Sequence, residues 1–235
     1  ARFRMINANI ITLKGNTSSE RAAARLIDSM PSNVKGHTFE AIKPDQVDRL
    51  MKKYKLKWTW PWTNEEYNIK AGLIMRPYTT ADPKKRMGCF ISHYMLWLRC
   101  VKYDEPIIIH EHDSIYFSNE KIPIHELEKS WYNIIGLNSP AGATRLASGY
   151  DRIVQESEGK IVKAPAIDDH HIPQGIAGNS SYYIKPKGAQ VMIDLTKEYG
   201  CWPNDALMCR QLVSTLGQTK HYYTGVQGIE STTTK

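Results

Sequence analysis

Three consecutive isoleucines at residues 107–109 constrain the fold of this chain more than any other feature. An unbroken run of β-branched residues after Pro106 is typical of a central strand that is buried on both faces of a sheet. The polar tetrapeptide His110-Glu111-His112-Asp113 follows directly. We therefore expect a mainly parallel sheet flanked by helices, with a polar cluster at the carboxyl end of a central strand.

The rest of the chain alternates strand and helix patterns. Strands are predicted at 5–13, 38–42, 132–137, 181–184 and 221–223. Helices are predicted at 17–29, 47–54, 186–199 and 204–216, and from 87 to the Asp-Glu-Pro sequence at 104–106. Residues 17–20 match the pattern of a capping box at the start of the first helix. Segment 55–83, rich in Trp, Tyr and Pro, has no regular pattern. The sequence thus predicts an α/β fold in a single domain over 1–235, with an irregular aromatic flap at about 55–83.

Charge and cysteine usage bear on partners and compartment. The formal charge is +7, from 31 Lys plus Arg against 24 Asp plus Glu, which suits polyanions or phosphorylated substrates and is also common in ordinary soluble proteins. The four cysteines show no C-x-x-C spacing, no run approaches the roughly 20 apolar residues of a membrane span, and residues 1–4 lack the apolar core of a signal peptide. We expect a reduced, cytoplasmic protein, in the host cytoplasm if the protein is viral.

The acids after the isoleucine strand suit a metal. Glu111 and Asp113 offer hard oxygen ligands, and a divalent cation between them would bridge the two phosphates of a nucleotide-sugar and neutralise the departing diphosphate. The two histidines favour Mn²⁺ over Mg²⁺, because imidazole suits transition metals better. The alternative is a strand end with solvated acids and no ligand.

The segments 87–97 and 106–113, taken together, resemble glycosyltransferase family 25, which includes lipopolysaccharide sugar transferases and collagen galactosyltransferases. The family pattern runs G-C-x-x-S-H-x-x-x-W, then an apolar strand, then an acidic triplet similar to E-D-D. The matching residues are Gly88, Cys89, Ser92, His93, Trp97, Glu111, His112 and Asp113. The resemblance continues at 9–13, at 178–189, which ends in K-G-A, and at 203–205. One departure is His112, which stands where the family has its middle acid and puts the metal geometry in question.

This resemblance implies a GT-A type fold with a Rossmann-like sheet, a UDP-sugar donor, and a metal at Glu111, His112 and Asp113. Asp205 is the candidate general base for an inverting transfer, and its alternative role is the N-cap of the following helix. The reserve candidates are Asp169 and His170, with His171, whose alternative is a solvated loop.

For the donor, we expect the chain after the first strand, at Thr12, Leu13 and Lys14, to face the nucleotide. Arg86 is the candidate phosphate partner, and a solvated basic run is its alternative. Ser92 and His93 would orient the donor or the metal, unless they form an ordinary core hydrogen bond.

The acceptor is the least constrained part. Lys57, Trp58, Trp60 and Trp62 interleave positive charge with aromatic rings, which suits phosphates together with stacked bases, although packing on the core is an equal alternative. We favour DNA, as in phage enzymes that glucosylate or arabinosylate 5-hydroxymethylcytosine, with the base flipped from the duplex. The competing acceptor is lipopolysaccharide or another surface glycan. A non-enzymatic alternative is a nucleic-acid-binding module in which His112 marks the loss of metal catalysis.

Overall fold

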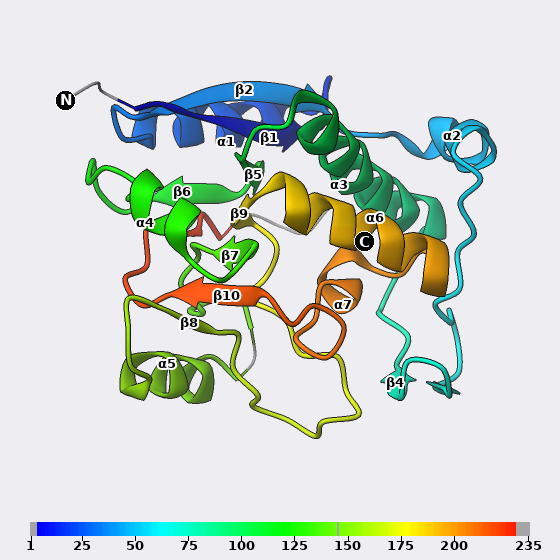
Figure 1. Cartoon of the computed structure of the whole chain (residues 1–235). Helices are drawn as coiled ribbons and strands as arrows, with labels where there is room; N and C mark the ends of the chain where they lie inside the picture. Colours follow the sequence, from blue (N-terminus) through cyan, green and yellow to red (C-terminus); the bar gives the residue numbers. More distant parts are fainter. Residues whose placement is uncertain (1–3, 145, 229–235) are drawn as a thin grey trace.

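A seven-stranded mixed sheet forms the centre of the computed structural model, which describes residues 4–144 and 146–228. The strand order is β2-β1-β5-β9-β7-β10-β8 (Figure 1). The strands are β1 (Ile6–Thr12), β2 (Val34–Glu40), β5 (Ile107–Glu111), β7 (Ile134–Gly136), β8 (Ile161–Lys163), β9 (Ser181–Ile184) and β10 (Leu216–Thr219).

Most strands of this sheet run in one direction. β1 is parallel to β2 and β5, and β7 is parallel to β10, whereas β9 lies antiparallel between β5 and β7 and β8 is an antiparallel edge. β1, β2, β5, β7 and β10 therefore share a direction, which confirms the mainly parallel α/β fold predicted from the sequence.

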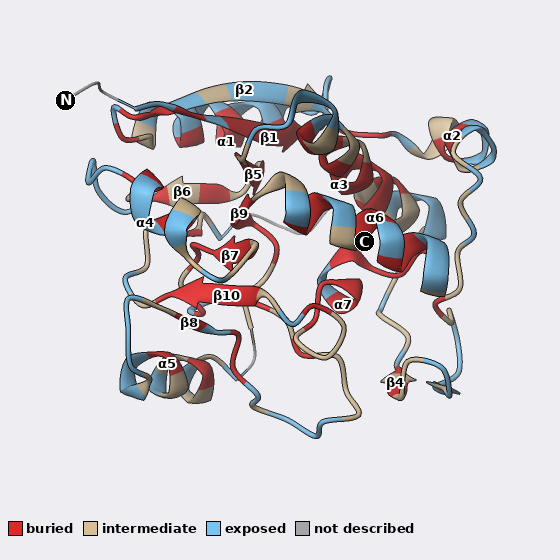
Figure 2. Cartoon of the chain, viewed as in Figure 1, coloured by how far each residue is buried: buried red, intermediate tan, exposed pale blue. Residues whose placement is uncertain are grey.

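The isoleucine strand is buried on both faces, as its composition predicts. Ile107 and Ile109 contact the hydrophobic cluster formed with α3 (Pro83–Tyr103) and α6 (Pro186–Tyr199). Ile108 points to the opposite face, in the cluster formed with α1 (Thr17–Ser29) and α4 (Ile124–Lys129). Figure 2 shows the buried residues along the central strands and on the sides of α3 and α6 that face them. The sheet is thus covered by helices on both faces.

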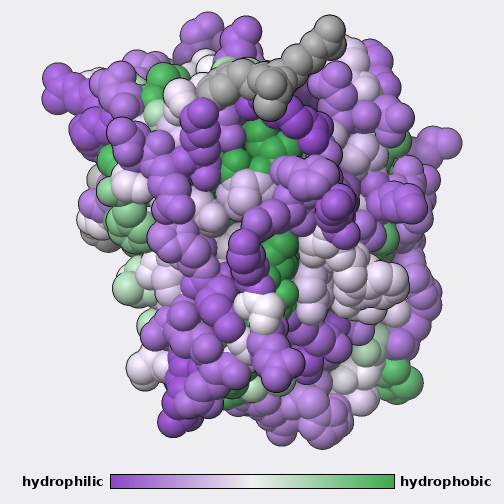
Figure 3. Space-filling view, turned by 60° about the vertical axis from the view of Figure 1, so that its left-hand side comes forward, coloured by the Kyte–Doolittle hydropathy of each residue, from purple (hydrophilic) through white to green (hydrophobic). Residues whose placement is uncertain are grey.

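The remaining elements lie at the edges of this three-layer core. They are the turn η1 (Pro44–Gln46), α2 (Val47–Lys53), α5 (Ala147–Glu156), α7 (Asn204–Leu207) and two two-stranded sheets, one formed by β3 (Glu66–Asn68) and β4 (Leu73–Met75), the other by β6 (Ser114–Tyr116) and β11 (Thr224–Val226). None of the described helices is long and apolar enough to cross a membrane. The face in Figure 3 is mostly hydrophilic, with hydrophobic side chains visible in recesses.

Several boundaries differ from the sequence prediction. The first helix covers 17–29 as expected, but its N-cap is Asn16, whose side chain accepts a hydrogen bond from the Ser19 amide, so residues 17–20 are not the capping box. The long helix begins at Pro83, four residues earlier than predicted, because Asp82 caps it by accepting from the Lys84 amide. The second strand covers 34–40 in place of 38–42.

The C-terminal part shows the largest difference. The helix predicted at 204–216 ends at Leu207, and the strand predicted at 221–223 lies at 224–226. After Leu207, the Arg210 amide donates to the Gln174 carbonyl at 2.7 Å, and its Nε donates to the Ala164 carbonyl at 2.9 Å. These contacts with a distant segment replace the helical hydrogen bonds, so tertiary structure overrides the local pattern here. Residues 1–3, part of the segment assessed for a signal peptide, lie outside the described residues.

Candidate active site

A cavity of about 880 Å³ opens over the carboxyl ends of the parallel strands β1 and β5. Its walls come from the loop after β1, the first turn of α1, the segment after β2, the first turns of α3 and the turn after β5. Cavities at this edge of an α/β sheet are the usual ligand sites, since the loops after parallel strands converge there. The lining residues of the first three walls include Leu13, Lys14, Gly15, Asn16, Ser18, Ser19, Ala41, Ile42, Lys43 and Pro44.

Three carboxylates interact electrostatically at one side of this cavity. Burial raises the pKa of Glu111, at the end of β5, to about 8, with further contributions from the charges of Asp113 and Asp205. Burial also raises the pKa of Asp113, and its Oδ1 is buried without a hydrogen-bond partner in the described structure. Desolvated acids so close together repel each other, and a divalent cation would relieve that repulsion. Glu111 and Asp113 thus offer oxygen donors that would suit a divalent cation, but the predicted set of Glu111, His112 and Asp113 is not among the described groups whose ligand atoms lie within 4.8 Å of one another.

His112 connects the end of β5 to the first turn of α1 through a hydrogen bond with Ser19. Its Nδ1 lies 2.9 Å from Ser19 Oγ, which also accepts a hydrogen bond from the Leu13 amide at 2.9 Å. Burial lowers the pKa of His112, and the charge of Asp113 partly opposes this effect. With Nδ1 hydrogen-bonded, only Nε2 remains for a ligand, and the role of His112 at the metal stays a prediction.

Ser92 and His93 hold α3 in place beside the cavity. Ser92 Oγ accepts from the Ile42 amide and donates to the Gly88 carbonyl, both at 2.9 Å. His93 Nδ1 lies 2.7 Å from the Tyr182 hydroxyl, and the two rings stack with centroids 5.7 Å apart. Both side chains therefore form core hydrogen bonds, and only Ser92 is among the cavity-lining residues.

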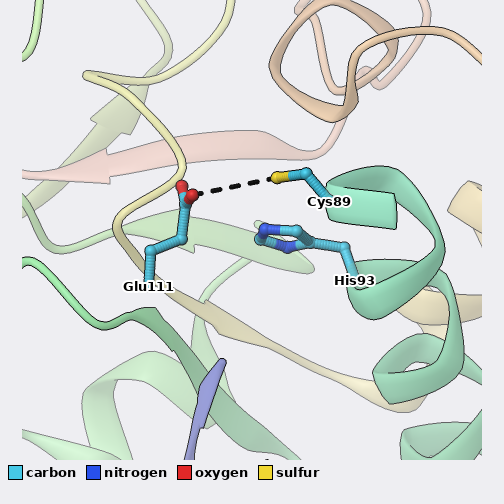
Figure 4. A group of neighbouring side chains, drawn as sticks. All are labelled: Cys89, His93 and Glu111. Carbon is cyan, nitrogen blue, oxygen red and sulfur yellow. Dashed lines mark hydrogen bonds between the residues drawn. The ribbon is translucent and has the colours of Figure 1, made fainter. Parts of the chain in front are cut away.

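Cys89 joins α3 to the acidic strand. Its Sγ lies 3.9 Å from Glu111 Oε2 and 3.6 Å from Asn204 Oδ1. Figure 4 shows the Glu111 carboxylate directed toward Cys89, with the His93 ring beside them. Ligand atoms of Cys89, His93 and Glu111 all lie within 4.8 Å of one another.

Asp205 lies near the acids, in the first turn of α7. The N-cap of α7 is Pro203, so Asp205 is free of the capping role considered from the sequence. The Tyr78 hydroxyl donates to Asp205 Oδ1 at 3.1 Å, and burial is the main cause of a raised Asp205 pKa. The positive charge of Arg86 opposes the rise in the Asp205 pKa. The Arg86 side chain is not part of the cavity wall, and its Nε donates a hydrogen bond to Thr80 Oγ1 at 2.7 Å.

The sequence model of glycosyltransferase family 25 (LPS biosynthesis protein) matches residues 5–208. The chain belongs to this family. It is therefore a nucleotide-sugar-dependent glycosyltransferase, and the match covers all the cavity-lining residues except Val226 and Gly228. No curated protein matches the chain by sequence. Among solved structures, the apo form of mouse xyloside xylosyltransferase 1 is similar, at 12% identity and a TM-score of 0.37 over 92% of this chain and 70% of that one.

The donor-binding residues that we expected after β1 of this family 25 enzyme fall into two groups. Leu13 and Lys14 line the cavity, and Lys14 also pairs with Glu40 at 3.2 Å. Thr12 is buried, and its hydroxyl donates to the Ile10 carbonyl, so its side chain does not line the cavity.

The aromatic flap of the enzyme packs against α3 and α7. Trp60 is 4% exposed, donates from Nε1 to the Arg76 carbonyl and packs on Tyr78 and Trp202. Trp58 and Trp62 are half-buried and stack in parallel, with centroids 5.0 Å apart. Lys57 is exposed. Trp60 thus belongs to the core, while Trp58, Trp62 and Lys57 keep accessible surface, and their role in acceptor binding stays a prediction.

The Asp169–His171 loop is separate from the cavity wall. Asp169 Oδ1 lies 3.0 Å from His171 Nδ1, and hydrogen bonds from His171 lower the pKa of Asp169. His170 is exposed and its ring lies 3.9 Å from that of His171. The Ile74 amide donates to the His171 carbonyl, which places this loop beside β4.

From the sequence, no site role was expected for Cys89, Tyr78 or Lys43. A signal existed for Cys89, because Cys89 and His93 are four residues apart and lie on the same helix face. Tyr78 and Lys43 lie in irregular segments, where no periodicity indicates the direction of a side chain. Their positions follow from tertiary structure alone.

Proposed function

We propose that this family 25 enzyme transfers a sugar from a UDP-sugar, bound in the cavity over β1 and β5, to an acceptor hydroxyl with the help of a divalent metal. The observation that carries the proposal is the presence of Glu111 and Asp113 in the wall of this cavity, with pKa values that burial raises, and the electrostatic interaction of Asp205 with Glu111. We also propose that the chain acts as one catalytic unit. The four free cysteines support a reducing, cytoplasmic compartment.

The donor diphosphate would be held by charge and by backbone amides. Lys14, Lys43 and Lys85 line the cavity, and the first turn of the 13-residue α1 opens into it at Ser18 and Ser19. A helix N-terminus and lysines together favour an anion. Calorimetric titration with UDP tests this: Lys43→Ala should weaken binding, whereas Lys163→Ala, on the edge strand β8, should not.

Glu111 and Asp113 are the proposed metal ligands, with His112 Nε2 as a further candidate. When bound, the metal would neutralise negative charge on the departing diphosphate. Mn²⁺ is preferred over Mg²⁺ because Cys89 Sγ and a ring nitrogen of His93 lie within 4.8 Å of the Glu111 carboxylate.

Asp205 is the proposed general base. The raised pKa of Asp205 brings proton acceptance closer to neutral pH, and the hydrogen bond from Tyr78 would orient its carboxylate toward the acceptor hydroxyl. Asp205→Asn should reduce turnover by at least about 100-fold with little change in UDP affinity. Asp169→Asn is the matched control; if it alone lost activity, the base would lie in the Asp169–His171 loop.

5-Hydroxymethylcytosine in DNA is the proposed acceptor. The net charge of +7 and the exposed lysines Lys52, Lys53, Lys55 and Lys57, which precede the Trp58–Trp62 stack, support a polyanionic acceptor with stackable bases. Trp60 packs on Tyr78, and Tyr78 contacts Asp205, so the flap that carries these groups adjoins the proposed base.

A panel of acceptors tests this choice. Labelled sugar from several UDP-sugars is offered in parallel to hydroxymethylated DNA, unmodified DNA and a lipopolysaccharide core. Label on hydroxymethylated DNA alone supports the proposal, and label on the glycan alone replaces it with a surface-glycan transferase. DNA binding without turnover of any donor would instead indicate an inactive nucleic-acid-binding module.

A further inference from the structure

His93 and His110 are two buried histidines of the site region with different surroundings. Both are 0% exposed. His110 has partners at both ring nitrogens, Ser114 Oγ at 3.2 Å and Tyr116 Oη at 2.8 Å. His93 has one partner, Tyr182 Oη at Nδ1, and its Nε2 is buried without any hydrogen bond in the described structure. A buried nitrogen without a hydrogen bond lowers the stability of the fold, so binding of a ligand at His93 Nε2 would be favourable.

The neighbours of His93 provide a set of metal-binding atoms. Cys89 lies one helical turn before it on α3, and Glu111 ends β5, so two elements fix the three side chains (Figure 4). Their ligand atoms lie within 4.8 Å of one another, and Cys89 Sγ is 3.9 Å from Glu111 Oε2. A tetrahedral ion with a Zn–S bond of about 2.3 Å and a Zn–O bond of about 2.0 Å separates its sulfur and oxygen ligands by about 3.5 Å, so a small side-chain movement closes the site.

We propose that Cys89, His93 and Glu111 form a binding site for a borderline-soft divalent cation such as Zn²⁺. Thiolate, imidazole and carboxylate together select zinc or cobalt over magnesium. Cys89 and Glu111 line the cavity, which gives the ion an entry path and leaves a fourth position toward the cavity or Asn204. The site shares Glu111 with the proposed donor-metal pair but is defined by the sulfur and nitrogen ligands on α3, and it does not depend on the proposed function.

The groups behind His93 suit a ligand histidine. Tyr182 Oη accepts a hydrogen bond from Trp97 Nε1 at 3.0 Å and lies 2.7 Å from His93 Nδ1. Metal binding at Nε2 would place the ring proton on Nδ1, from which Tyr182 Oη would then accept. Burial also keeps the ring neutral, as a ligand must be, since it lowers the pKa of His93 to about 3. Such an outer hydrogen bond fixes the tautomer and the orientation of a metal-bound imidazole.

The experiment is a titration of metal-stripped full-length protein with Co²⁺, followed by absorption spectroscopy. We expect about one Co²⁺ per chain with ligand-field bands of a tetrahedral ion and a thiolate-to-cobalt charge-transfer band, which Zn²⁺ removes by displacement. Cys89→Ser should abolish the charge-transfer band, and His93→Gln should weaken Co²⁺ binding by more than about 10-fold. Ion binding at Asp169, His170 and His171 would give no thiolate band.

Matched controls separate ligand loss from misfolding. Cys100→Ser removes another buried thiol of the same helix, and His110→Gln removes the buried histidine whose nitrogens are both occupied, so both should keep the charge-transfer band. Asp113→Ala should also keep the band while sugar transfer is lost, which distinguishes failure of this site from failure of the proposed function. No thiolate band in the wild type, or a band that survives Cys89→Ser, would overturn the proposal.

Discussion

Replacing Gly88 with alanine tests how closely α3 must approach the chain that follows β2. A Cβ at residue 88 would lie 2.5 Å from the Ile42 carbonyl oxygen, where ordinary contacts begin at 3.4 Å, so about 0.9 Å of separation is needed. The two segments cannot separate freely, because Ser92 Oγ accepts from the Ile42 amide and donates to the Gly88 carbonyl. The clash is with backbone, which has no alternative rotamer.

The expected cost follows from two opposing effects. Overpacking costs about 1–3 kcal/mol, while alanine in place of glycine within a helix gains about 0.5–1 kcal/mol. We expect a net loss of about 1 kcal/mol in the free energy of unfolding, which lowers Tm by roughly 2–4 °C for a domain of this size. UDP affinity should fall as well, since Ile42 and Ser92 line the cavity.

Gly149→Ala is the matched control for this substitution. Gly149 lies in α5 with a Cβ position that meets nothing within 4 Å, so helix propensity alone should act and Tm should rise by about 1–4 °C. Urea unfolding and thermal melts followed by circular dichroism give both numbers. If Gly88→Ala stabilises the protein as Gly149→Ala does, the close approach of α3 to residue 42 is refuted.

The remaining predictions concern the flap and the buried histidine. Trp60→Ala should destabilise the fold by about 3–5 kcal/mol, because Trp60 is a core residue, whereas Trp62→Ala should weaken acceptor binding with a nearly unchanged Tm; equal effects on stability would contradict the placement. Burial lowers the pKa of His110 to about 3, below its value of about 6.5 in the unfolded chain. The neutral ring of His110 therefore contributes fully to the stability of the fold above pH 6.5, and this contribution is lost as the pH falls toward 3. The stability of the wild type relative to His110→Gln should thus decrease by about 1.4 kcal/mol per pH unit from pH 6 to 4 in urea titrations, and a constant difference would argue against the buried neutral ring.

The central sheet was predictable because its signals are local. The isoleucines at 107–109 favour a strand that is buried on both faces. The spacing of the apolar residues in α3 indicates which side of the helix is buried. The end of α3 at Tyr103 also agrees with the Asp-Glu-Pro sequence that follows. Elements of this kind depend on residues that are close in the chain.

The C-terminal region and the flap were less predictable because distant contacts decide them. Residues 208–215 have a helical pattern, yet the hydrogen bond from the Arg210 amide to the Gln174 carbonyl holds this segment in a non-helical conformation. Trp58, Trp60 and Trp62 look equivalent in the sequence, but only Trp60 meets Trp202 and enters the core. No property of the local sequence separates these three residues.

The candidate site was predictable in part. Glu111 and Asp113 follow from the position of acids at a strand end, and Ser92 and His93 from the family pattern. The family pattern also contains Cys89, but its proximity to Glu111 depends on α3 crossing beside β5, and the hydrogen bond from Tyr78 to Asp205 joins residues 127 positions apart. The structure therefore adds the contacts between elements, which the sequence does not encode locally.

The most direct test of the account is the release of UDP from a panel of UDP-sugars in the presence of acceptor, with Mn²⁺ added or chelated. We predict Mn²⁺-dependent release by the wild type and a loss of release in Asp113→Ala, whose melting curve should match the wild type because Asp113 holds no part of the hydrophobic core. UDP release that persists at the wild-type rate in Asp113→Ala, or in the presence of chelator, would contradict the placement of the metal and the donor in this cavity.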